Sequence, residues 1–287
     1  MNPETMAVGD IDVVEVSGPD ASSYLQGQIS QDIDAIGVDK ASWSFVLQPS
    51  GKVESWFRVL RIGDSTFCMY VESGFGSDLA DRLARFLIRT DATINLCEPA
   101  RVLSIRAAGP VLIDKVGSSD GARAISVDWP EFRGIDLIGD HEQIESTALE
   151  LGVGSSGASN FERMRISAGV PRLGTDISVG SIPAAAGDAV IAASVSFTKG
   201  CYTGQELVAR MHSRGGQAPS RLQRLTSEAA LDVAAEVTRD GDSVGVVTSA
   251  AGPVGIATLT RKVSPGDRVE VSGVPALVTD LPGGALA

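Results

Sequence analysis

The stretch that decides the fold is residues 196–210, which read Ser-Phe-Thr-Lys-Gly-Cys-Tyr-Thr-Gly-Gln-Glu-Leu-Val-Ala-Arg. The β-favouring residues at 195–198 predict a strand at its start. Gly200 can take backbone angles that are closed to other residues, which predicts a sharp turn. A helix is expected to begin at about Gly204. The chain should therefore run strand, turn, helix, with Cys201 at the bend.

Cys201 lies in a setting that favours reactivity. Thr203 and Glu206 form a capping box, which marks the helix start. The positive end of a helix and the charge of Lys199 both favour the thiolate form of a nearby cysteine. Free amide groups at the helix start also favour an anion. These residues alone leave two interpretations open, a reactive thiol or a small buried apolar side chain.

The composition is that of an ordinary soluble protein and excludes several functions. The chain has 287 residues, which predicts two or three subdomains. Its 24 basic and 36 acidic residues give a net charge of −12. We therefore expect no direct nucleic-acid binding and no contact with anionic membranes. Residues 1–15 lack a signal peptide and no apolar run could span a membrane, so the expected location is the cytoplasm.

The cysteines and histidines are too few and too scattered for a metal centre. Cys68, Cys97 and Cys201 are odd in number and contain no CxxC pair. This pattern disfavours a disulfide framework, a zinc site or an iron–sulfur cluster held by this chain alone. His141 and His212 are the two histidines of the chain. No metal site is therefore expected.

The first two thirds of the chain alternate strands and helices. A hairpin is expected from the strands 43–47 and 52–61, because the turn Gln48–Gly51 has proline second and glycine fourth. The clearest helix, 77–89, has a stripe of leucines, and its charged residues, including Arg82, are expected to face water. The other expected elements are strands at 12–16 and 66–72, and helices at 18–28, 110–116, 142–151 and 160–168.

The last third has a different character. Turn residues there separate short β-favouring runs at regular spacing, which predicts a small antiparallel barrel. We accordingly divide the chain into 1–216 and a C-terminal barrel, 217–287. The expected barrel strands are Leu222–Thr226, Glu236–Thr238, Ser243–Ser249, Gly255–Leu259, Arg268–Ser272 and Ala276–Thr279.

The octapeptide KGCYTGQE at 199–206 resembles the KGCYxGQE signature of the YgfZ family, folate-binding relatives of the glycine-cleavage T-protein. Other matches follow in family order: LQGQ at 25–28, PSGK at 49–52 and RISAG at 165–169. The resemblance implies an α+β cloverleaf, with two interleaved α+β subdomains in 1–216 and a C-terminal antiparallel β-barrel. It also implies a central channel that holds tetrahydrofolate or a derivative.

The same resemblance implies a function. Family members are accessory proteins that assist assembly or repair of iron–sulfur clusters in client enzymes, including radical enzymes that modify tRNA. The implied partners are a reduced folate and iron–sulfur client or assembly proteins. Cys201 and Lys199 are the implied catalytic residues. The implied folate-binding residues are Tyr202, Gly204, Gln205, Glu206, Arg165 and Gln28.

The residues leave two alternative functions open. The first is a folate-dependent aminomethyltransferase. T-proteins carry two aspartates where Ser55 and Trp56 stand, and Glu54 points away from Ser55 by strand alternation. The family's usual acids are also missing at Ser167 and at 184–186, which bears on the pterin contacts. The second alternative is a non-catalytic interaction module, in which Cys201 is inert.

Overall fold

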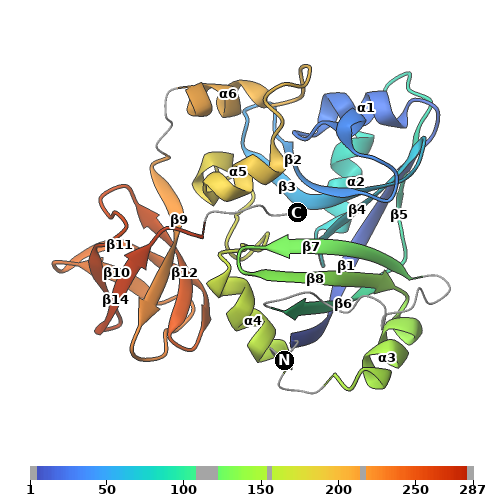
Figure 1. Cartoon of the computed structure of the whole chain (residues 1–287). Helices are drawn as coiled ribbons and strands as arrows, with labels where there is room; N and C mark the ends of the chain where they lie inside the picture. Colours follow the sequence, from blue (N-terminus) through green and yellow to red (C-terminus); the bar gives the residue numbers. More distant parts are fainter. Residues whose placement is uncertain (1–4, 108–121, 154–156, 214–217, 283–287) are drawn as a thin grey trace.

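The computed structural model describes residues 5–107, 122–153, 157–213 and 218–282, and it shows a large sheet region beside a separate barrel (Figure 1). The sheet region holds the strands β1 (Thr5–Ser17), β2 (Ala41–Leu47), β3 (Val53–Gly63), β4 (Thr66–Glu72), β5 (Thr93–Leu96), β6 (Ala100–Ala107), β7 (Arg123–Trp129) and β8 (Phe132–Gly139). Its helices are α1 (Ala21–Gln28), α2 (Gly76–Ala84), α3 (His141–Glu150), α4 (Gly157–Ser167), α5 (Asp188–Ser194) and α6 (Gln205–Ser213), with short 3-10 turns at Ile33–Ala35 and Pro183–Ala186.

The long strand β1 joins two halves of one sheet. The strand order is β2-β3-β4-β1-β6-β8-β7, with β5 paired to β1 off this path. The second half of β1, from Ile11 to Ser17, pairs with β4. Its first half, from Thr5 to Ile11, pairs with β6. Because one strand serves both halves, the two halves of the sheet share a continuous backbone scaffold.

Helix α4 connects the sheet to the barrel. It packs against β1 on one side and against β11 and β12 of the barrel on the other (Figure 1). Helices α5 and α6 lie at the opposite end, where α5 contacts β2. The main core lies within the sheet region and includes Leu25, Phe45, Phe57 and Leu83, all fully buried. Its apolar burial is the main source of stability for this part.

The barrel confirms the prediction for the last third of the chain. Its six antiparallel strands close in the order β10-β11-β12-β9-β14-β13. Each expected run lies on one of them: β9 (Ser220–Ser227), β10 (Glu236–Arg239), β11 (Asp242–Ala251), β12 (Val254–Thr260), β13 (Arg268–Val271) and β14 (Val274–Thr279). The barrel has a core of its own, built from aliphatic side chains. The proposed boundary at 216/217 lies outside the described residues.

Several predictions for the sheet region were right and others were wrong. The hairpin of β2 and β3 and the strand Thr66–Glu72 are confirmed. The expected strand at 195–198 does not form, because this segment has no partner strand and its Ser196 amide donates only to the Ser30 carbonyl. Helix α2 ends at Ala84 rather than Arg89, because the backbone beyond it makes tighter bonds, such as that from the Leu87 amide to the Ala84 carbonyl, and Arg89 has a positive φ of 55°. The expected helix at 110–116 lies outside the described residues.

Arg82 is a further correction, since it was expected in water and is 2% exposed. Its guanidinium donates to Glu54 at 2.6 Å, to the Gln28 side chain at 3.2 Å and to the Leu47 carbonyl at 3.0 Å. It also stacks 4.3 Å from the ring centre of Phe86. These partners replace the water that a buried guanidinium loses, so the charge is tolerated inside.

Candidate functional site

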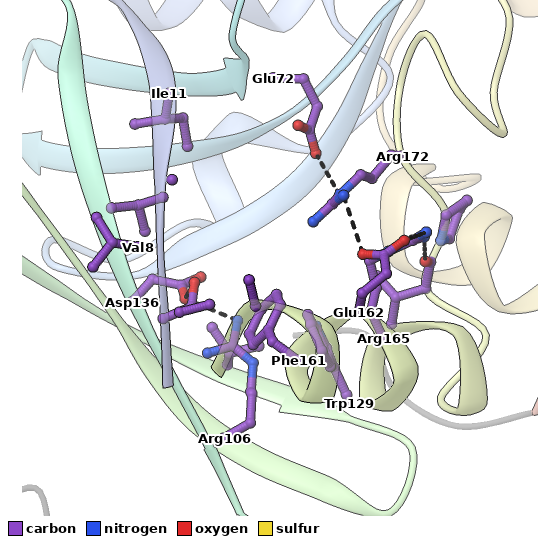
Figure 2. A pocket seen from close by; sticks show the side chains of 18 of the residues that line it. Val8, Ile11, Glu72, Arg106, Trp129, Asp136, Phe161, Glu162, Arg165 and Arg172 are labelled. Carbon is purple, nitrogen blue, oxygen red and sulfur yellow. Dashed lines mark hydrogen bonds and ion pairs between the residues drawn. The ribbon is translucent and has the colours of Figure 1, made fainter. Parts of the chain in front are cut away.

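A central pocket lies where the sheet, α4 and the barrel meet. Its volume is about 770 Å³, within the range of small-molecule sites. The walls come from β1, β2, β3, β4, β6, β7 and β8, from α4, and from the end of β11 and the turn that follows it. Figure 2 shows side chains from both halves of the sheet and from α4 around this space. The pocket therefore exists only because all three parts of the fold contribute to it.

Aromatic rings form two parts of the pocket wall. Trp43 and Trp56 stack with ring centres 4.0 Å apart and planes 12° apart. The Trp56 indole N–H donates to the Ser194 hydroxyl at 2.9 Å, which fixes the ring. Trp129 and Phe161 lie 5.5 Å apart between centres on another wall. Such rings offer flat apolar surfaces for a conjugated ligand.

A network of ion pairs forms one charged wall, to which α4 contributes Glu162 and Arg165 (Figure 2). Arg172 lies 3.1 Å from the Glu162 carboxylate and 3.8 Å from that of Glu72. Arg165 pairs with Glu162 and, at 3.0 Å, with Asp176. Loss of hydration raises the pKa of Glu72, although both arginines oppose the shift. Desolvation also acts on Glu162, but its hydrogen bonds from Arg165 hold the pKa below the usual range.

Arg165 lines the pocket but has no N–H group left for a ligand. Its Nε and one Nη donate to Glu162. The other Nη donates to Asp176 and to the Val170 carbonyl, and the remaining N–H donates to Ser249 in the barrel. A guanidinium has five N–H donors. Arg165 therefore ties α4 to the barrel and shapes the pocket, and its predicted folate contact stays a prediction.

A second charged wall contains two arginines and one carboxylate. Arg58 on β3 lies 3.3 Å from Asp136 on β8, and Arg106 on β6 lies 2.8 Å from the same group. Ser104 donates to Asp136 at 2.7 Å. Arg106 also lies over the Trp129 ring, 4.3 Å from its centre. Burial lowers the pKa of Arg58 to about 10, although Asp136 opposes the shift.

The Cys201 loop, residues 195–204, lies on the surface beside the β2–β3 hairpin. Gly204 has φ of +81°, and a Cβ there would lie 2.5 Å from the Gln48 carbonyl oxygen. Gly51 of the hairpin turn also has positive φ, and a Cβ there would lie 2.4 Å from Leu207 Cβ. The PSGK turn and the KGCYTG stretch are therefore packed backbone to backbone. Cys201 is exposed at this contact, whereas Cys68 is buried and Cys97 is half-buried.

Lys199 is held by backbone rather than by an acid. Its ammonium donates to the carbonyl oxygens of Ile29 at 2.8 Å and Gln31 at 2.7 Å, just beyond the end of α1. It also lies 5.3 Å from the ring centre of Tyr202. Burial lowers the pKa of Lys199 to about 8, although Asp32 and Asp34 oppose the shift. These contacts anchor the Cys201 loop to the end of α1.

The helix after Cys201 starts as predicted but is capped differently. Helix α6 begins at Gln205, one residue after the expected start. The Gln205 side-chain oxygen accepts from the Tyr202 amide at 3.3 Å, and the Thr203 amide donates to the Gly27 carbonyl. No hydrogen bond joins Thr203 to Glu206 in the described chain, so the capping box was a wrong prediction. A tertiary contact to α1 takes its place.

The predicted site residues fall into two groups in space. Arg165 lines the pocket, whereas Cys201, Lys199, Tyr202, Gly204, Gln205, Glu206 and Gln28 do not. Gln28 instead accepts a hydrogen bond from Arg82. Sequence reasoning missed the charged pocket residues, namely Arg58, Glu72, Arg106, Asp136, Glu162 and Arg172. Charged residues inside strand runs, such as Arg58 and Asp136, were the signal that could have found some of them.

The described ranges contain no cluster of three or more histidine, cysteine or acidic residues able to hold a metal ion. Within the same ranges, every helix is too short or too polar to cross a membrane.

Comparison of structures gives the class of fold. The chain matches the glycine cleavage system aminomethyltransferase T from Bartonella henselae with a TM-score of 0.78 and 17% identity. The match covers 97% of this chain and 86% of the transferase. The predicted α+β fold with a C-terminal antiparallel barrel is therefore confirmed as the fold of aminomethyltransferase T.

Comparison of sequences places the chain more closely. The tRNA-modifying protein YgfZ of Edwardsiella ictaluri is 26% identical over 216 residues, 70% of this chain and 65% of that protein. The YgfZ of Photorhabdus laumondii is 27% identical over 222 residues, 73% of this chain and 67% of that protein. The mitochondrial iron-sulfur cluster assembly factor IBA57 homolog of Neurospora crassa is 26% identical over 220 residues, 71% of this chain and 49% of that protein. No family model matches the chain.

The chain is a distant homologue of the YgfZ and IBA57 type of protein. This result confirms the resemblance drawn from the KGCYTGQE stretch. The matched region spans about two thirds of the bacterial relatives and about half of the fungal one.

Proposed function

We propose that this protein binds a reduced folate in the central pocket and assists assembly or repair of iron–sulfur clusters through Cys201. Its clients would include enzymes that modify tRNA, and its site of action would be the cytoplasm. The observation that carries the proposal is the separation of the two features. The pocket can hold a ligand, while the thiol is exposed outside it and free to meet a protein partner.

Folate binding is supported by the chemistry of the pocket walls. A pterin ring carries N–H donors, and the carboxylates of Glu72 and Glu162 offer acceptors for them. The stacked Trp43 and Trp56 offer a flat surface for an aromatic ring. These residues would bind and orient the ligand. A bound reduced folate would supply a one-carbon carrier.

The part of the pocket wall that β3 forms favours an accessory role over aminomethyl transfer. Trp56 lines the pocket where the transferases carry an acid, and Ser55 lies on the opposite face of the strand and is 3% exposed. Glu54 does not line the pocket and is paired with Arg82 at 2.6 Å. No carboxylate of β3 is therefore placed to move a proton on the ligand.

The iron–sulfur role is supported by the exposed thiol and by the name of the fungal relative. Iron–sulfur clusters are commonly held by four cysteines, and Cys68 and Cys97 are too buried and too distant in sequence to join Cys201 in a CxxC-type set. Cys201 would therefore act together with thiols of a partner protein. Lys199, held at the end of α1, would keep the loop in position for that contact.

The first experiment measures folate binding to the full chain by titration calorimetry with tetrahydrofolate. We expect binding, together with a thermal midpoint that rises with ligand concentration. Absence of both effects at about millimolar ligand would contradict a folate site.

The second experiment tests Cys201 by complementation in cells that lack the native protein. Cys201→Ser should fold normally and fail to support iron–sulfur enzymes. Cys68→Ser is the matched control, and it should complement. Full complementation by Cys201→Ser would show that the thiol is dispensable, and the chain would then fit the interaction-module alternative. Robust methylene-folate production with glycine-cleavage partners would instead support an aminomethyltransferase.

A further inference from the structure

We propose that Arg58 and Arg106 form an oxyanion subsite in the central pocket, which takes a compact group such as a carboxylate. The source of the oxyanion is either a carboxylate of the pocket's own ligand or a free inorganic anion. Only the first source rests on the proposed folate function. The subsite itself rests on charge and on unused hydrogen-bond donors.

The charges of this wall do not balance within the described chain. Arg58 and Arg106 are 6% and 2% exposed, and both pair with the single carboxylate of Asp136. The neighbouring Tyr70 stays neutral, because burial raises its pKa above the usual value. Two buried cations therefore share one anion. An uncompensated buried charge is unfavourable unless another group neutralises it.

The other acids of the pocket are already paired. Asp10 lies 3.1 Å from Arg101. Glu72 and Glu162 both pair with Arg172. None of these carboxylates contacts Arg58 or Arg106 in the described residues. The negative charge that would balance Arg58 and Arg106 must therefore come from a group other than these carboxylates.

The hydrogen bonds of the two arginines are incomplete as well. Arg58 makes two, to Asp136 and to the Ser126 carbonyl. Arg106 makes three, to Asp136 and to the carbonyls of Ile105 and Ile135. With five N–H donors each, Arg58 keeps three and Arg106 keeps two without a partner among the described residues. In each arginine one of these is the buried Nε, which leaves two Nη N–H groups of Arg58 and one of Arg106 for a ligand.

Arg165 provides an internal comparison. It lines the same pocket, is equally buried at 2% exposed, and uses all five of its N–H donors. Full pairing is therefore attainable for a buried arginine in this fold. Arg58 and Arg106 differ from Arg165 in keeping N–H donors without a partner among the described residues. Planar guanidinium groups match the oxygens of a carboxylate or phosphate.

The two charged walls of the pocket also differ in the groups they offer. On the α4 side, the carboxylates of Glu72 and Glu162 line the pocket and offer acceptors, beside the cations of Arg163, Arg165 and Arg172. On the β3–β6–β8 side, two cations face one carboxylate. A ligand with N–H donors at one end and a carboxylate at the other matches this arrangement, and tetrahydrofolate has both.

The test uses two variants of one ion pair, Arg58→Met and Asp136→Asn. Each removes one partner, so general destabilisation acts in the same direction for both. Their effects on anion binding should be opposite, because the first removes the cation and the second removes the competing carboxylate. Arg239→Met, in the barrel ion pair with Asp267, is the matched control. The probes are tetrahydrofolate, a tetrahydropterin without the benzoylglutamate, and inorganic phosphate, measured by titration calorimetry and thermal midpoint.

With tetrahydrofolate, Arg58→Met should raise Kd about tenfold or more, while Asp136→Asn should leave it unchanged or lower it. Affinity for the tetrahydropterin should be the same in every variant, which also shows that the pocket is intact. If phosphate stabilises the wild type in an Arg58-dependent way but tetrahydrofolate affinity does not depend on Arg58, the source is a free anion.

If tetrahydrofolate fails to bind any variant, the folate proposal fails, and phosphate then decides the subsite. Phosphate should raise the thermal midpoint of the wild type, and raise it more in Asp136→Asn, but have no effect on Arg58→Met. The subsite is overturned if the binding of neither tetrahydrofolate nor phosphate depends on Arg58, or if both ion-pair variants weaken binding equally.

Discussion

The central pocket and the Cys201 loop hold their functional groups by different means. In the pocket, buried side chains from four or more elements are fixed by ion pairs, such as the 2.8 Å contact between Arg106 and Asp136. In the loop, a short stretch is fixed by its backbone, through the positive φ of Gly204 and the carbonyl contacts of Lys199. The pocket has the size of a small-molecule site, and the loop leaves the Cys201 thiol exposed.

Because of this difference, the pocket and the Cys201 loop should be sensitive to different kinds of mutation. The pocket depends on charges that cannot be left unpaired, so loss of one partner exposes the other to a low-dielectric interior. The loop depends on close backbone approach, so an added methyl group disturbs it while loss of a polar contact matters less. Four measurements test this contrast, from the largest expected effect to the smallest.

Arg165→Met should give the largest loss of stability. It leaves Asp176, whose side chain is fully buried, without its cation and breaks the tie between α4 and the barrel. We expect the free energy of unfolding in urea to fall by about 3–5 kcal/mol. The control is Arg163→Met on the same helix, which is exposed and should change stability by less than about 0.5 kcal/mol. Equal losses for the two variants would contradict the role of the buried network.

Gly204→Ala should give the next largest effect. The added Cβ would meet the Gln48 carbonyl oxygen at 2.5 Å, in a backbone conformation with φ of +81°. Strain and overpacking together predict a loss of about 2–4 kcal/mol in the free energy of unfolding. Gly200→Ala is the matched control, because no atom lies within 4 Å of its added Cβ. The backbone contact is refuted if both variants are equally stable.

Alkylation should distinguish the three thiols at pH 8. Cys201 is exposed, whereas burial raises the pKa of Cys68 to about 11 and also raises that of Cys97. At pH 8 only about one Cys68 in a thousand is then a thiolate. Mass spectrometry after timed iodoacetamide treatment should show Cys201 labelled at least about a hundredfold faster than Cys68, with Cys97 between them. Labelling of Cys68 at the rate of Cys201 would show that the sheet core opens readily.

The pH dependence of stability should show the smallest effect. The pKa of Lys199 is lowered from 10.5 to about 8 in the folded state, mainly by burial. Between these values the unfolded chain binds more protons, so this residue makes stability rise with pH from about 8 to about 10.5. Urea unfolding across this range should show a steeper rise for the wild type than for Lys199→Met. Parallel curves would mean that Lys199 keeps its ordinary pKa.

The parts that the sequence predicted well depend on neighbouring residues. The β2–β3 hairpin follows from Pro49 and Gly51 in one turn, and the six barrel strands follow from short β-favouring runs between turn residues. The start of α6 was predicted to within one residue. The KGCYTGQE stretch was enough to indicate the family, because the residues of this signature are contiguous.

The predictions that failed depended on contacts between distant segments. Residues 195–198 favour a strand locally, but no strand among the described residues pairs with them, and the Ser196 amide donates to the Ser30 carbonyl instead. Arg82 was assigned to water because its helix neighbours are charged, yet Glu54, 28 residues earlier, holds it inside. The capping box expected at Thr203 does not form, and the Thr203 amide instead donates to the Gly27 carbonyl of α1. Local propensity is overridden in each case by a tertiary contact.

By itself, the sequence determined the order of the elements, the barrel and the thiol-bearing stretch of this protein, since turn geometry and strand propensity act over a few residues. Only the tertiary structure decided the pocket. Arg58 on β3 and Asp136 on β8 are 78 residues apart in the chain and three strands lie between theirs in the sheet order, yet the folded sheet brings them within 3.3 Å. Burial then decides which charges are compensated and which donors stay free, because desolvation acts on a group according to everything packed around it.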